Sequence, residues 1–358
     1  MGGSVSPCVF STWLSVGNVQ DAPLGAILSG PEIAQANATI RAGRNFGGSR
    51  SCGPESPCGP DNDDARSCSP DTDDECSPGT PGSAPRGTER TMETDLPESA
   101  ILPLIEEHTG PVAGIHRTER GFSSDLTAVV DCAMGPFFVK AMRNRPGGRR
   151  ESLVRERRIN AHLGHISPHL LWDVEAEDWL VLGFEVVDGR SSDLAPDSTD
   201  LALVVDAIGD IGRLSLPQFA REWTETRWDK FASDSSEAEL FRGDSLLYTD
   251  INPSNFIVVK RRVWAVDWAW PTRGAGFIDP ALLVIQFIAA GHTPGSAEKW
   301  AERLPAWRQA APQAIDAFAA ANLRMYRAAV DRKPDVDWLK AMADACQVWI
   351  DHRGVTTE

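Results

Sequence analysis

Short apolar runs between residues 112 and 184 predict β-strands. Each run has five to seven residues and contains mainly apolar and β-branched side chains, and turn-forming residues separate most of them, as expected for strands that are at least half buried. The runs are VAGIHRT, LTAVVDC, PFFVKAM, LLWDV and DWLVLGF. Together they predict an antiparallel sheet of about five strands.

Helical patterns flank this region and then dominate the chain. One helix is expected to start at Thr94 or Asp95, with Pro97 in its first turn, and to end before Gly110. A second covers residues 149–163, where apolar residues recur on one side. Further helical patterns cover residues 201–214, capped by Ser198 or Thr199, and residues 216–231, 296–309, 312–331 and 335–352.

This order of elements predicts an α+β fold with two lobes. A small lobe, residues 94–187, would hold the antiparallel sheet and one main helix, and a larger, mostly helical lobe would follow in residues 188–358. A chain of 358 residues is long enough for both lobes and an additional segment. That segment is residues 1–93, which we predict to be a disordered, low-complexity tail.

The composition of the tail supports this prediction. From Gly43 to Thr91 the chain contains no Val, Ile or Leu, so it cannot bury enough apolar surface to offset the entropy of ordering. Cysteines are frequent there, but those between Cys52 and Cys76 form no C-x2-C pair and have no histidine beside them, so a zinc site is not expected. Ordered-looking sequence opens at Met92, and the residues before it are also interpretable as an over-extended start.

The charge of the chain is acidic, with 51 Asp and Glu against 35 Lys and Arg. This argues against nucleic acid or an anionic membrane surface as the main partner and is compatible with a cationic small molecule. The sequence has no run of about 18 apolar residues and no basic N-terminal start, so neither a membrane span nor a signal peptide is expected. Only two cysteines fall in the predicted lobes, which suits a reducing compartment, and we expect a cytoplasmic protein.

The candidate chemistry is concentrated in residues 246–267, LLYTDINPSNFIVVKRRVWAVD. Two β-branched runs flank a basic turn at residues 260–262, which predicts a hairpin preceded by a loop. Asp250 and Asn255 lie in the loop and Asp267 follows the second strand, so the hairpin would bring two carboxylates and one carboxamide to the same end. Asp and Asn beside a proline are also common turn formers, and the isolated pair is compatible with either role.

The D-x-x-x-x-N…(I/V)-D pattern of this stretch resembles the catalytic core of the aminoglycoside phosphotransferase and choline kinase-like superfamily, which has a protein-kinase-like fold. The resemblance covers roughly residues 94–350. It implies that Asp250 orients an acceptor hydroxyl and takes its proton, and that Asn255 and Asp267 bind Mg²⁺ on the phosphates of ATP or GTP. The sequence contains no Walker-type G-x-x-x-x-G-K-[ST] loop.

A lysine in the strand PFFVKAM fits the same resemblance. Lys140 is the only charge in that strand, and an unpaired charge in a half-buried strand is costly. The resemblance implies that this lysine contacts the α- and β-phosphates and pairs with a glutamate of the next helix, for which Glu156 fits the spacing in related phosphotransferases and Glu151 is the competing candidate. The alternative is a lysine whose stem lies along the sheet and whose amine is solvated.

Two further segments would complete the nucleotide site. Gly121, Ser123 and Ser124 lie in a stretch of small residues before LTAVVDC, where backbone N–H groups can approach phosphates, although any hairpin turn would look similar. After DWLVLGF the chain leaves the sheet. The resemblance implies a hinge there, in which main-chain atoms of Glu185 and Val187 bind the purine edge.

The chain departs from the family pattern at two positions. Tyr248 stands where the family usually has His, two residues before the base, at a position that is mostly structural. Leu283 stands where the family often repeats an acidic residue after Asp279. Asp279 itself precedes Pro280 at the start of a predicted helix, where it would cap that helix, brace the catalytic loop, or both.

The remaining motifs have structural interpretations. The H-x2-H-x3-H motif at residues 162–169 is interrupted by a glycine and a proline, so its rings are expected at a helix end and not around a metal. Residues 233–240, SDSSEAEL, are expected to be a solvated connection, with a loop near the acceptor site as the less favoured alternative. Four tryptophans are candidates for stacking on an acceptor, although core packing is the more common role: Trp268, Trp270, Trp300 and Trp307.

We therefore expect a small-molecule kinase that transfers the γ-phosphoryl of ATP or GTP to a hydroxyl of a small molecule, such as an aminoglycoside-type antibiotic. The superfamily also serves amino-alcohols, sugars and macrolides. The alternative is a pseudokinase, a nucleotide-binding or regulatory module that Tyr248 and Leu283 alone favour. Protein phosphorylation is a weaker option, because the short stretch between Asp267 and Asp279 leaves little room for an activation segment.

Overall fold

The computed structural model describes residues 4–5, 17–18, 97–118 and 124–356. The predicted disordered tail lies almost entirely outside these residues, as do the cysteines at 52–76 and both Gly121 and Ser123. In the first of two compact units, Met1–Ser56, the described residues pair as two short antiparallel strands, β1 (Ser4–Val5) and β2 (Gly17–Asn18). The other described elements belong to the second unit, Pro57–Glu358.

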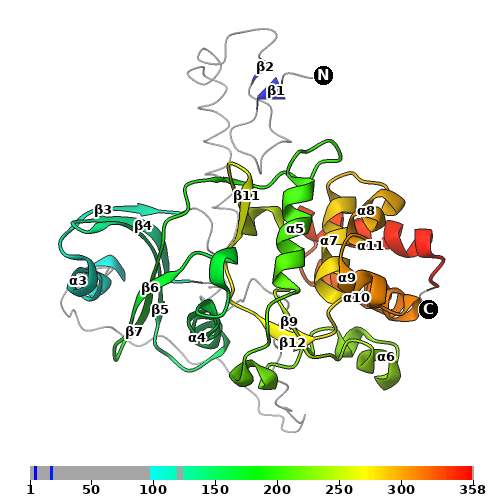
Figure 1. The fold of residues 1–358 in the computed structure, drawn as a ribbon, viewed down its shortest axis with the longest axis horizontal. Helices are drawn as coiled ribbons and strands as arrows, with labels where there is room; N and C mark the ends of the chain where they lie inside the picture. Colours follow the sequence, from blue (N-terminus) through cyan, green and yellow to red (C-terminus); the bar gives the residue numbers. More distant parts are fainter. Residues whose placement is uncertain (1–3, 6–16, 19–96, 119–123, 357–358) are drawn as a thin grey trace, which may run out of the picture. The chain divides into compact units, whose positions relative to one another are not determined.

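An antiparallel sheet of five strands forms the small lobe of this unit (Figure 1). The strand order is β3-β4-β5-β7-β6, and every neighbouring pair is antiparallel. The sheet predicted from the apolar runs is therefore confirmed. Its strands are β3 (Val112–Arg117), β4 (Leu126–Cys132), β5 (Gly135–Arg143), β6 (Leu170–Glu175) and β7 (Trp179–Phe184).

Two helices cover the two faces of this sheet. Ile101 of the first helix packs in one apolar cluster with Val139 of β5, whereas Leu153 of the second packs in another cluster with Met142 of β5. Because side chains alternate along a strand, Lys140 lies on the same face as Met142, toward the second helix. The two helices are α3 (Pro97–Thr109) and α4 (Gly148–Asn160).

The large lobe is mostly helical, and its helices share one extensive hydrophobic core. The two-lobed α+β architecture expected from the sequence is therefore confirmed. Two details differ. The helix predicted at residues 296–309 is divided, because Pro305 starts a new helix. The N-cap position of α5 is occupied by Asp200, whose backbone N–H donates to the Ser198 hydroxyl at 3.1 Å. The helices are α5 (Leu201–Ile211), α7 (Ile278–Ala289), α8 (Pro294–Ala301), α9 (Pro305–Gln309), α10 (Pro312–Arg332) and α11 (Asp337–Arg353).

The prediction of a helix at residues 216–231 is wrong. Only two 3₁₀ turns form there, η2 (Gln218–Glu222) and η3 (Asp229–Phe231). Between them the backbone pairs with Arg273, whose N–H donates to the Trp223 carbonyl at 2.6 Å and whose carbonyl accepts the Glu225 N–H at 2.8 Å. These bonds replace the ones that a continuous helix would make.

Residues 233–240, expected to be a connection, contain a short helix, α6 (Ser235–Glu239). Asp234 caps it by accepting the backbone N–H groups of Ser236 and Glu237.

Short strands position the candidate catalytic segment. The predicted hairpin is confirmed as β10 (Phe256–Val259) and β11 (Arg262–Ala265), with β8 (Arg190–Ser191) on its outer edge. A second pair, β9 (Ser245–Leu247) with β12 (Thr272–Gly274), lies before and after the hairpin in the chain. Asp250 and Asn255 thus connect β9 to β10, and Asp267 connects β11 to β12. Among the described helices, none is long and apolar enough to span a bilayer.

Candidate active site

Lys140 joins three separate elements at the junction of the two lobes. Its Nζ donates to both carboxylate oxygens of Glu156 on α4, at 2.8 and 2.9 Å, and to Oδ1 of Asp267 at 2.8 Å. The structure therefore brings Glu156 to the lysine, whereas the competing Glu151 is exposed and contacts Arg155. The lysine does not extend into solvent, because its side chain is only 9% exposed.

The electrostatics of this cluster keep the lysine charged. Burial disfavours the ammonium form, but the charges of Asp267 and Glu156 outweigh that effect and raise the pKa of Lys140. Burial raises the pKa of Glu156, and Lys140 and the backbone N–H of Trp268 oppose this shift. The Asp267 side chain is the most accessible of the three, at 33% exposure against 6% for Glu156.

The loop after β9 places Asp250 and Asn255 beside Asp267. The Asn255 carbonyl accepts the N–H of Val266 at 2.9 Å, directly before Asp267, so the two predicted metal ligands lie at the same end of the hairpin. Asn255 Nδ2 donates to the Asp250 carbonyl at 3.2 Å, and Asn252 Nδ2 donates to Asp250 Oδ1 at 3.0 Å. All three predicted oxygen-bearing side chains are thereby brought together.

The protonation equilibrium of Asp250 is shifted in this environment. Burial and the nearby charge of Asp267 raise the pKa of Asp250 to about 6, although hydrogen bonds from Asn252 and Asn255 and the charge of Arg227 act in the opposite direction. A carboxyl group with a raised pKa is better matched to accepting a proton near neutral pH than an ordinary aspartate.

Asp279 braces the catalytic loop. Its carboxylate accepts the backbone N–H groups of Tyr248 and Thr249, each at 2.8 Å, while Phe277 occupies the N-cap position of α7. Of the two roles considered for Asp279, the structure thus shows the brace. The Tyr248 hydroxyl donates to the Val266 carbonyl and thereby ties the loop to the segment directly before Asp267.

The backbone at this site is strained. Thr249 has φ +64° and Asp267 has φ +62°, both in the left-handed region that non-glycine residues seldom adopt. Such conformations persist only where surrounding contacts hold them, and they cluster at functional sites. In this chain they directly precede Asp250 and coincide with Asp267.

The predicted hinge offers two backbone groups to a ligand. The N–H of Glu185 donates to the His169 carbonyl at 2.9 Å and is therefore not free. The carbonyl of Glu185 and the N–H of Val187 have no hydrogen bond with the part of the chain that the structure describes. Ser124, the one described residue of the predicted phosphate loop, lies half-buried two residues before β4.

A buried ion pair whose charge acts on Asp250 is not predicted by the sequence. Arg227 donates from Nε and Nη2 to Glu225, whose side chain is 1% exposed, and the Thr272 hydroxyl donates to the same carboxylate at 2.7 Å. Thr272 lies opposite Leu247, three residues before Asp250. The sequence indicates this ion pair only through a polar Thr-Glu-Thr-Arg stretch inside the segment predicted to be a helix. No local pattern indicates that this stretch contacts Thr272.

The donor set at the hairpin fits a magnesium ion. Asn255 Oδ1 and Asp267 Oδ2 make no hydrogen bond with the described residues. Neither of them is a fully buried polar atom without a partner. Mg²⁺ prefers oxygen ligands and is commonly held by one or two protein side chains together with phosphates and water. Within the described ranges no group of three or more His, Cys, Asp or Glu is placed so that it could hold a metal ion.

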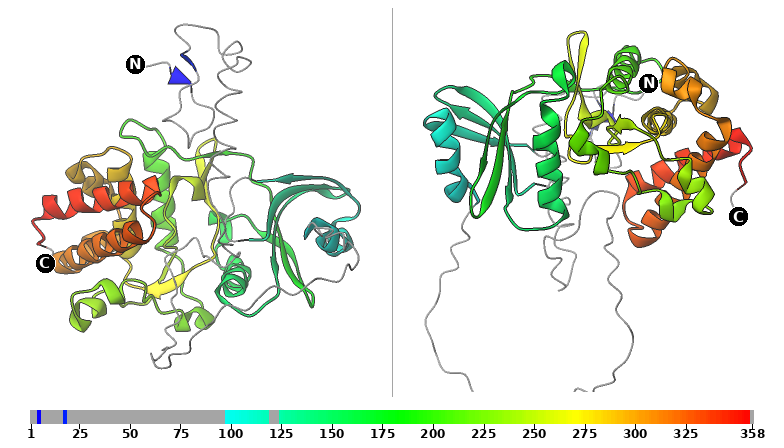
Figure 2. Two further views of the ribbon diagram at one scale, coloured as in Figure 1. Left: turned by 180° about the vertical axis from the view of Figure 1, so that it is seen from behind. Right: turned by 60° about the horizontal axis from the view of Figure 1, so that its bottom comes forward.

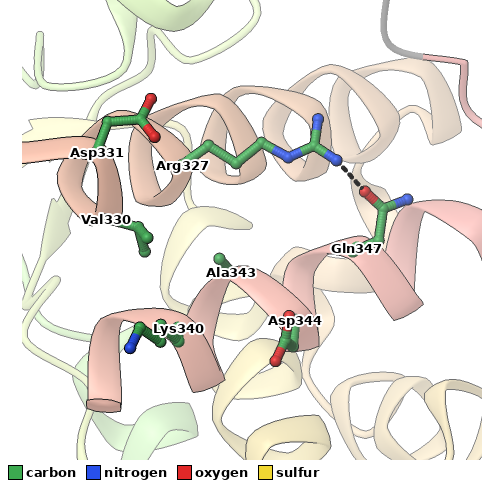
Figure 3. Close-up of a pocket in the computed structure, with 7 residues that line it drawn as sticks. All are labelled: Arg327, Val330, Asp331, Lys340, Ala343, Asp344 and Gln347. Carbon is green, nitrogen blue, oxygen red and sulfur yellow. Dashed lines mark hydrogen bonds between the residues drawn. The ribbon is translucent and has the colours of Figure 1, made fainter. Parts of the chain in front are cut away.

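The tryptophans considered for acceptor binding lie mainly in the core. Trp268 and Trp307 are buried in the large-lobe core, and Trp300 packs against it. A hollow of about 220 Å³ lies elsewhere, between α10 and α11, and Arg327 and Gln347 form a hydrogen bond beside it (Figure 3). None of the predicted site residues lines this hollow.

Solved structures similar to this chain include aminoglycoside phosphotransferases and choline kinases. A putative aminoglycoside phosphotransferase from Ralstonia eutropha is 11% identical with a TM-score of 0.49, covering 73% of this chain and 99% of that one. Choline kinase LicA from Streptococcus pneumoniae is 11% identical, with a TM-score of 0.48 and coverage of 71% and 97%. An aminoglycoside phosphotransferase from Streptomyces rimosus is 17% identical, with a TM-score of 0.45 and coverage of 70% and 98%.

No protein-family model and no curated protein sequence matches the chain.

Proposed function

We propose that the chain is a small-molecule kinase that transfers the γ-phosphoryl group of ATP or GTP to a hydroxyl of its acceptor. One observation carries this proposal: a buried lysine, held by a helix glutamate, contacts an aspartate that lies beside an asparagine and a second aspartate. Phosphoryl transfer in kinase-like sites depends on positioning and charge neutralisation, and this set of groups supplies both.

Each group has a separate role in the proposed reaction. Asp250 would accept a hydrogen bond from the acceptor hydroxyl and take its proton as the new P–O bond forms. Lys140, oriented by Glu156, would bind the α- and β-phosphates. Asn255 and Asp267 would hold Mg²⁺, which would neutralise the phosphate charge when bound.

The nucleotide base would bind at the hinge between the two proposed lobes, residues 94–187 and 188–358. The carbonyl of Glu185 and the N–H of Val187 are the available groups there, because the N–H of Glu185 is already used. Ser124 and its neighbours Gly121 and Ser123 would approach the phosphates through their backbone N–H groups. The acceptor class is a small hydroxyl compound, with aminoglycoside-type antibiotics as the first group to test.

A mass-spectrometric turnover experiment tests the proposal. The full-length protein would be incubated with Mg·ATP or Mg·GTP and with pooled aminoglycosides, amino-alcohols, macrolides and sugars. We expect one acceptor to gain a phosphoryl group, and we expect Asp250→Asn to reduce the rate by about 10² to 10⁴ while nucleotide binding is kept. Equal turnover by wild type and Asp250→Asn would remove the role assigned to Asp250.

The pseudokinase alternative predicts a different result. Nucleotide would raise the melting temperature of the protein, but no phosphorylated product would form with any acceptor class. Absence of both nucleotide binding and turnover would refute both hypotheses.

A further inference from the structure

Helix α4, which carries Glu156, packs against both lobes. Leu153 belongs to the apolar cluster on one face of the small-lobe sheet. Ile159, near the end of the helix, and Leu163, just beyond the helix, belong to the large-lobe core. Figures 1 and 2 show the helix between the sheet and the large lobe. The position of Glu156 therefore depends on contacts outside the sheet that holds Lys140.

Two arginines on either side of Glu156 contact aromatic rings of the large lobe. The Arg155 guanidinium lies 5.1 Å from the ring centroid of Trp223 and 5.9 Å from that of Trp270. The Arg158 guanidinium lies 4.5 Å from the ring centroid of Phe219 and 5.7 Å from that of Trp223. These distances are within the range of cation–π attraction. We refer to these five residues as the aromatic clasp.

The rings of the clasp support one another. Phe219 and Trp223 meet edge to face, with centroids 5.4 Å apart and an interplanar angle of 65°. Trp223 is only 6% exposed, so its ring is a fixed surface for both guanidinium groups. Trp223 also belongs to the segment whose backbone bonds to Arg273, because its carbonyl accepts the Arg273 N–H at 2.6 Å.

The arginines have few other partners. Arg158 has no carboxylate partner among the described residues, and the ion pair of Arg155 with Glu151 is long, at 3.5 Å. Their neighbour Arg157 differs, because it pairs with Asp173 at 3.3 Å and with Glu175 at 2.9 Å on β6. Arg155 and Arg158 thus contact mainly aromatic rings of the large lobe, whereas Arg157 pairs with carboxylates of the sheet.

The clasp also reaches the segment that carries Asp267. Trp270 lies three residues after Asp267, and the Thr249 hydroxyl beside Asp250 donates to the Trp270 carbonyl at 3.1 Å. One set of contacts therefore connects the helix of Glu156 to both segments that carry the other acidic residues of the site.

We propose that Arg155 and Arg158 are positioning residues that hold α4 against the large lobe, so that Glu156 keeps Lys140 in the geometry that binds phosphates before any nucleotide is present. The consequence for turnover rests on the proposed function, whereas the ordering of α4 does not. A loosened α4 would populate states in which Glu156 leaves Lys140, and the affinity for nucleotide would fall by the fraction of competent protein.

Hydrogen exchange of the full-length protein without nucleotide tests the ordering directly. We expect the Arg155→Ala/Arg158→Ala variant to lower the protection of the α4 amides by about tenfold, because both arginines lose their cation–π contacts with the rings. The matched control, Arg157→Ala on the same helix, is expected to change it by less than about twofold, because exposed ion pairs contribute little. Equal protection in the two variants would overturn the proposal.

A double-mutant cycle tests the ring contact. Phe219→Leu is expected to reproduce most of the effect of Arg158→Ala, and the combination is expected to cost less than the sum of the single changes, because both remove the contact of Arg158 with Phe219, the shorter of its two ring contacts. Arg158→Lys, which keeps the cation, is expected to restore part of the protection. Full additivity, or no rescue by lysine, would contradict the clasp.

Nucleotide affinity connects the clasp to function. Calorimetry with Mg·AMP-PNP is expected to show a five- to tenfold weaker affinity in the Arg155→Ala/Arg158→Ala variant, which corresponds to the free energy of about one or two cation–π contacts. The melting temperature of the variant is expected to stay within about 2 °C of wild type. Unchanged affinity together with reduced α4 protection would refute the positioning role. Failure of the wild-type protein to bind the nucleotide would refute the proposed function instead, and the exchange experiment would still decide whether the clasp orders α4.

Discussion

Replacing Lys140 by methionine perturbs the centre of the site without changing its volume greatly. Among the residues that the structure describes, the lysine is the only cation hydrogen-bonded to the Glu156 and Asp267 carboxylates, with N···O distances from 2.8 to 2.9 Å. Lys140→Met would leave two carboxylates facing each other. One of them, Glu156, is only 6% exposed and cannot be solvated in place.

The expected loss of stability follows from this geometry. Removing one member of a buried ion pair costs about 3 to 5 kcal/mol, because the remaining charge is left uncompensated. The Asp267 side chain is 33% exposed and regains some solvation, so its share is discounted. We therefore expect Lys140→Met to lower the free energy of unfolding by about 3 kcal/mol.

A second variant separates charge from packing. Glu156→Gln removes the buried negative charge and keeps an oxygen that can accept the Trp268 N–H. In the Lys140→Met background this change is expected to recover about 1 to 2 kcal/mol, because no uncompensated charge then stays buried. Urea denaturation followed by circular dichroism at pH 7, without divalent ions, measures all four members of the cycle. The reasoning fails if Lys140→Met costs less than about 1 kcal/mol or if the two changes are additive.

Three further changes test the loop and the metal site. Asp267→Asn is expected to weaken binding of Mg·ATP about tenfold or more relative to metal-free ATP, measured by calorimetry, and equal loss for both forms would count against metal binding. Tyr248→Phe removes the donor to the carbonyl of the half-buried Val266 and is expected to cost about 1 kcal/mol in urea denaturation. Burial raises the pKa of Asp279 from 3.8 to about 6, so the folded protein binds the proton of this carboxyl group more tightly than the unfolded chain does. The resulting contribution to stability is greatest below pH 4 and is lost as the pH rises through 6. The unfolding free energy of wild type relative to Asp279→Asn is therefore expected to fall by about 3 kcal/mol between pH 4 and pH 7, and a flat or rising difference would refute the shift.

The strands and the position of Lys140 were predictable because both depend on local sequence pattern. Apolar runs with turn residues between them determine which segments pair, and a single charge in such a run indicates a partner. The choice between Glu151 and Glu156 is also partly local. Glu156 is three residues before the buried Ile159 on the inner side of α4, whereas Glu151 is exposed near the start of the helix.

The segment from residue 216 to 231 could not be predicted in the same way. Its apolar and aromatic residues have spacings that a helix would also produce. The segment forms two 3₁₀ turns because Arg273, about fifty residues later, bonds to the backbone of Trp223 and Glu225. Glu225 is fixed by Thr272 in the same manner. Local propensity decides an element only where tertiary contacts agree with it, and here the pairing with β12 prevailed.

Asp279 shows the same limit at the level of a single side chain. The sequence places it before a proline at a helix start, which is compatible with a cap. The structure uses it to accept two N–H groups of a loop about thirty residues earlier, and Phe277 takes the cap position instead. A long-range hydrogen bond of this kind leaves no periodic trace in the sequence.

The hydrogen bonds of Lys140 constrain how a nucleotide can enter the site. An ammonium group has three donors, and here they are directed at Glu156 Oε1, Glu156 Oε2 and Asp267 Oδ1. A phosphate oxygen can therefore gain a bond from Lys140 only if one carboxylate oxygen gives one up. Asp267 is the more exposed partner, and it is the residue whose negative charge a divalent ion would compensate. If Asp267 binds the metal as proposed, it would give up its bond to Lys140 at the same time, and the binding of nucleotide and of metal would be coupled through one carboxylate.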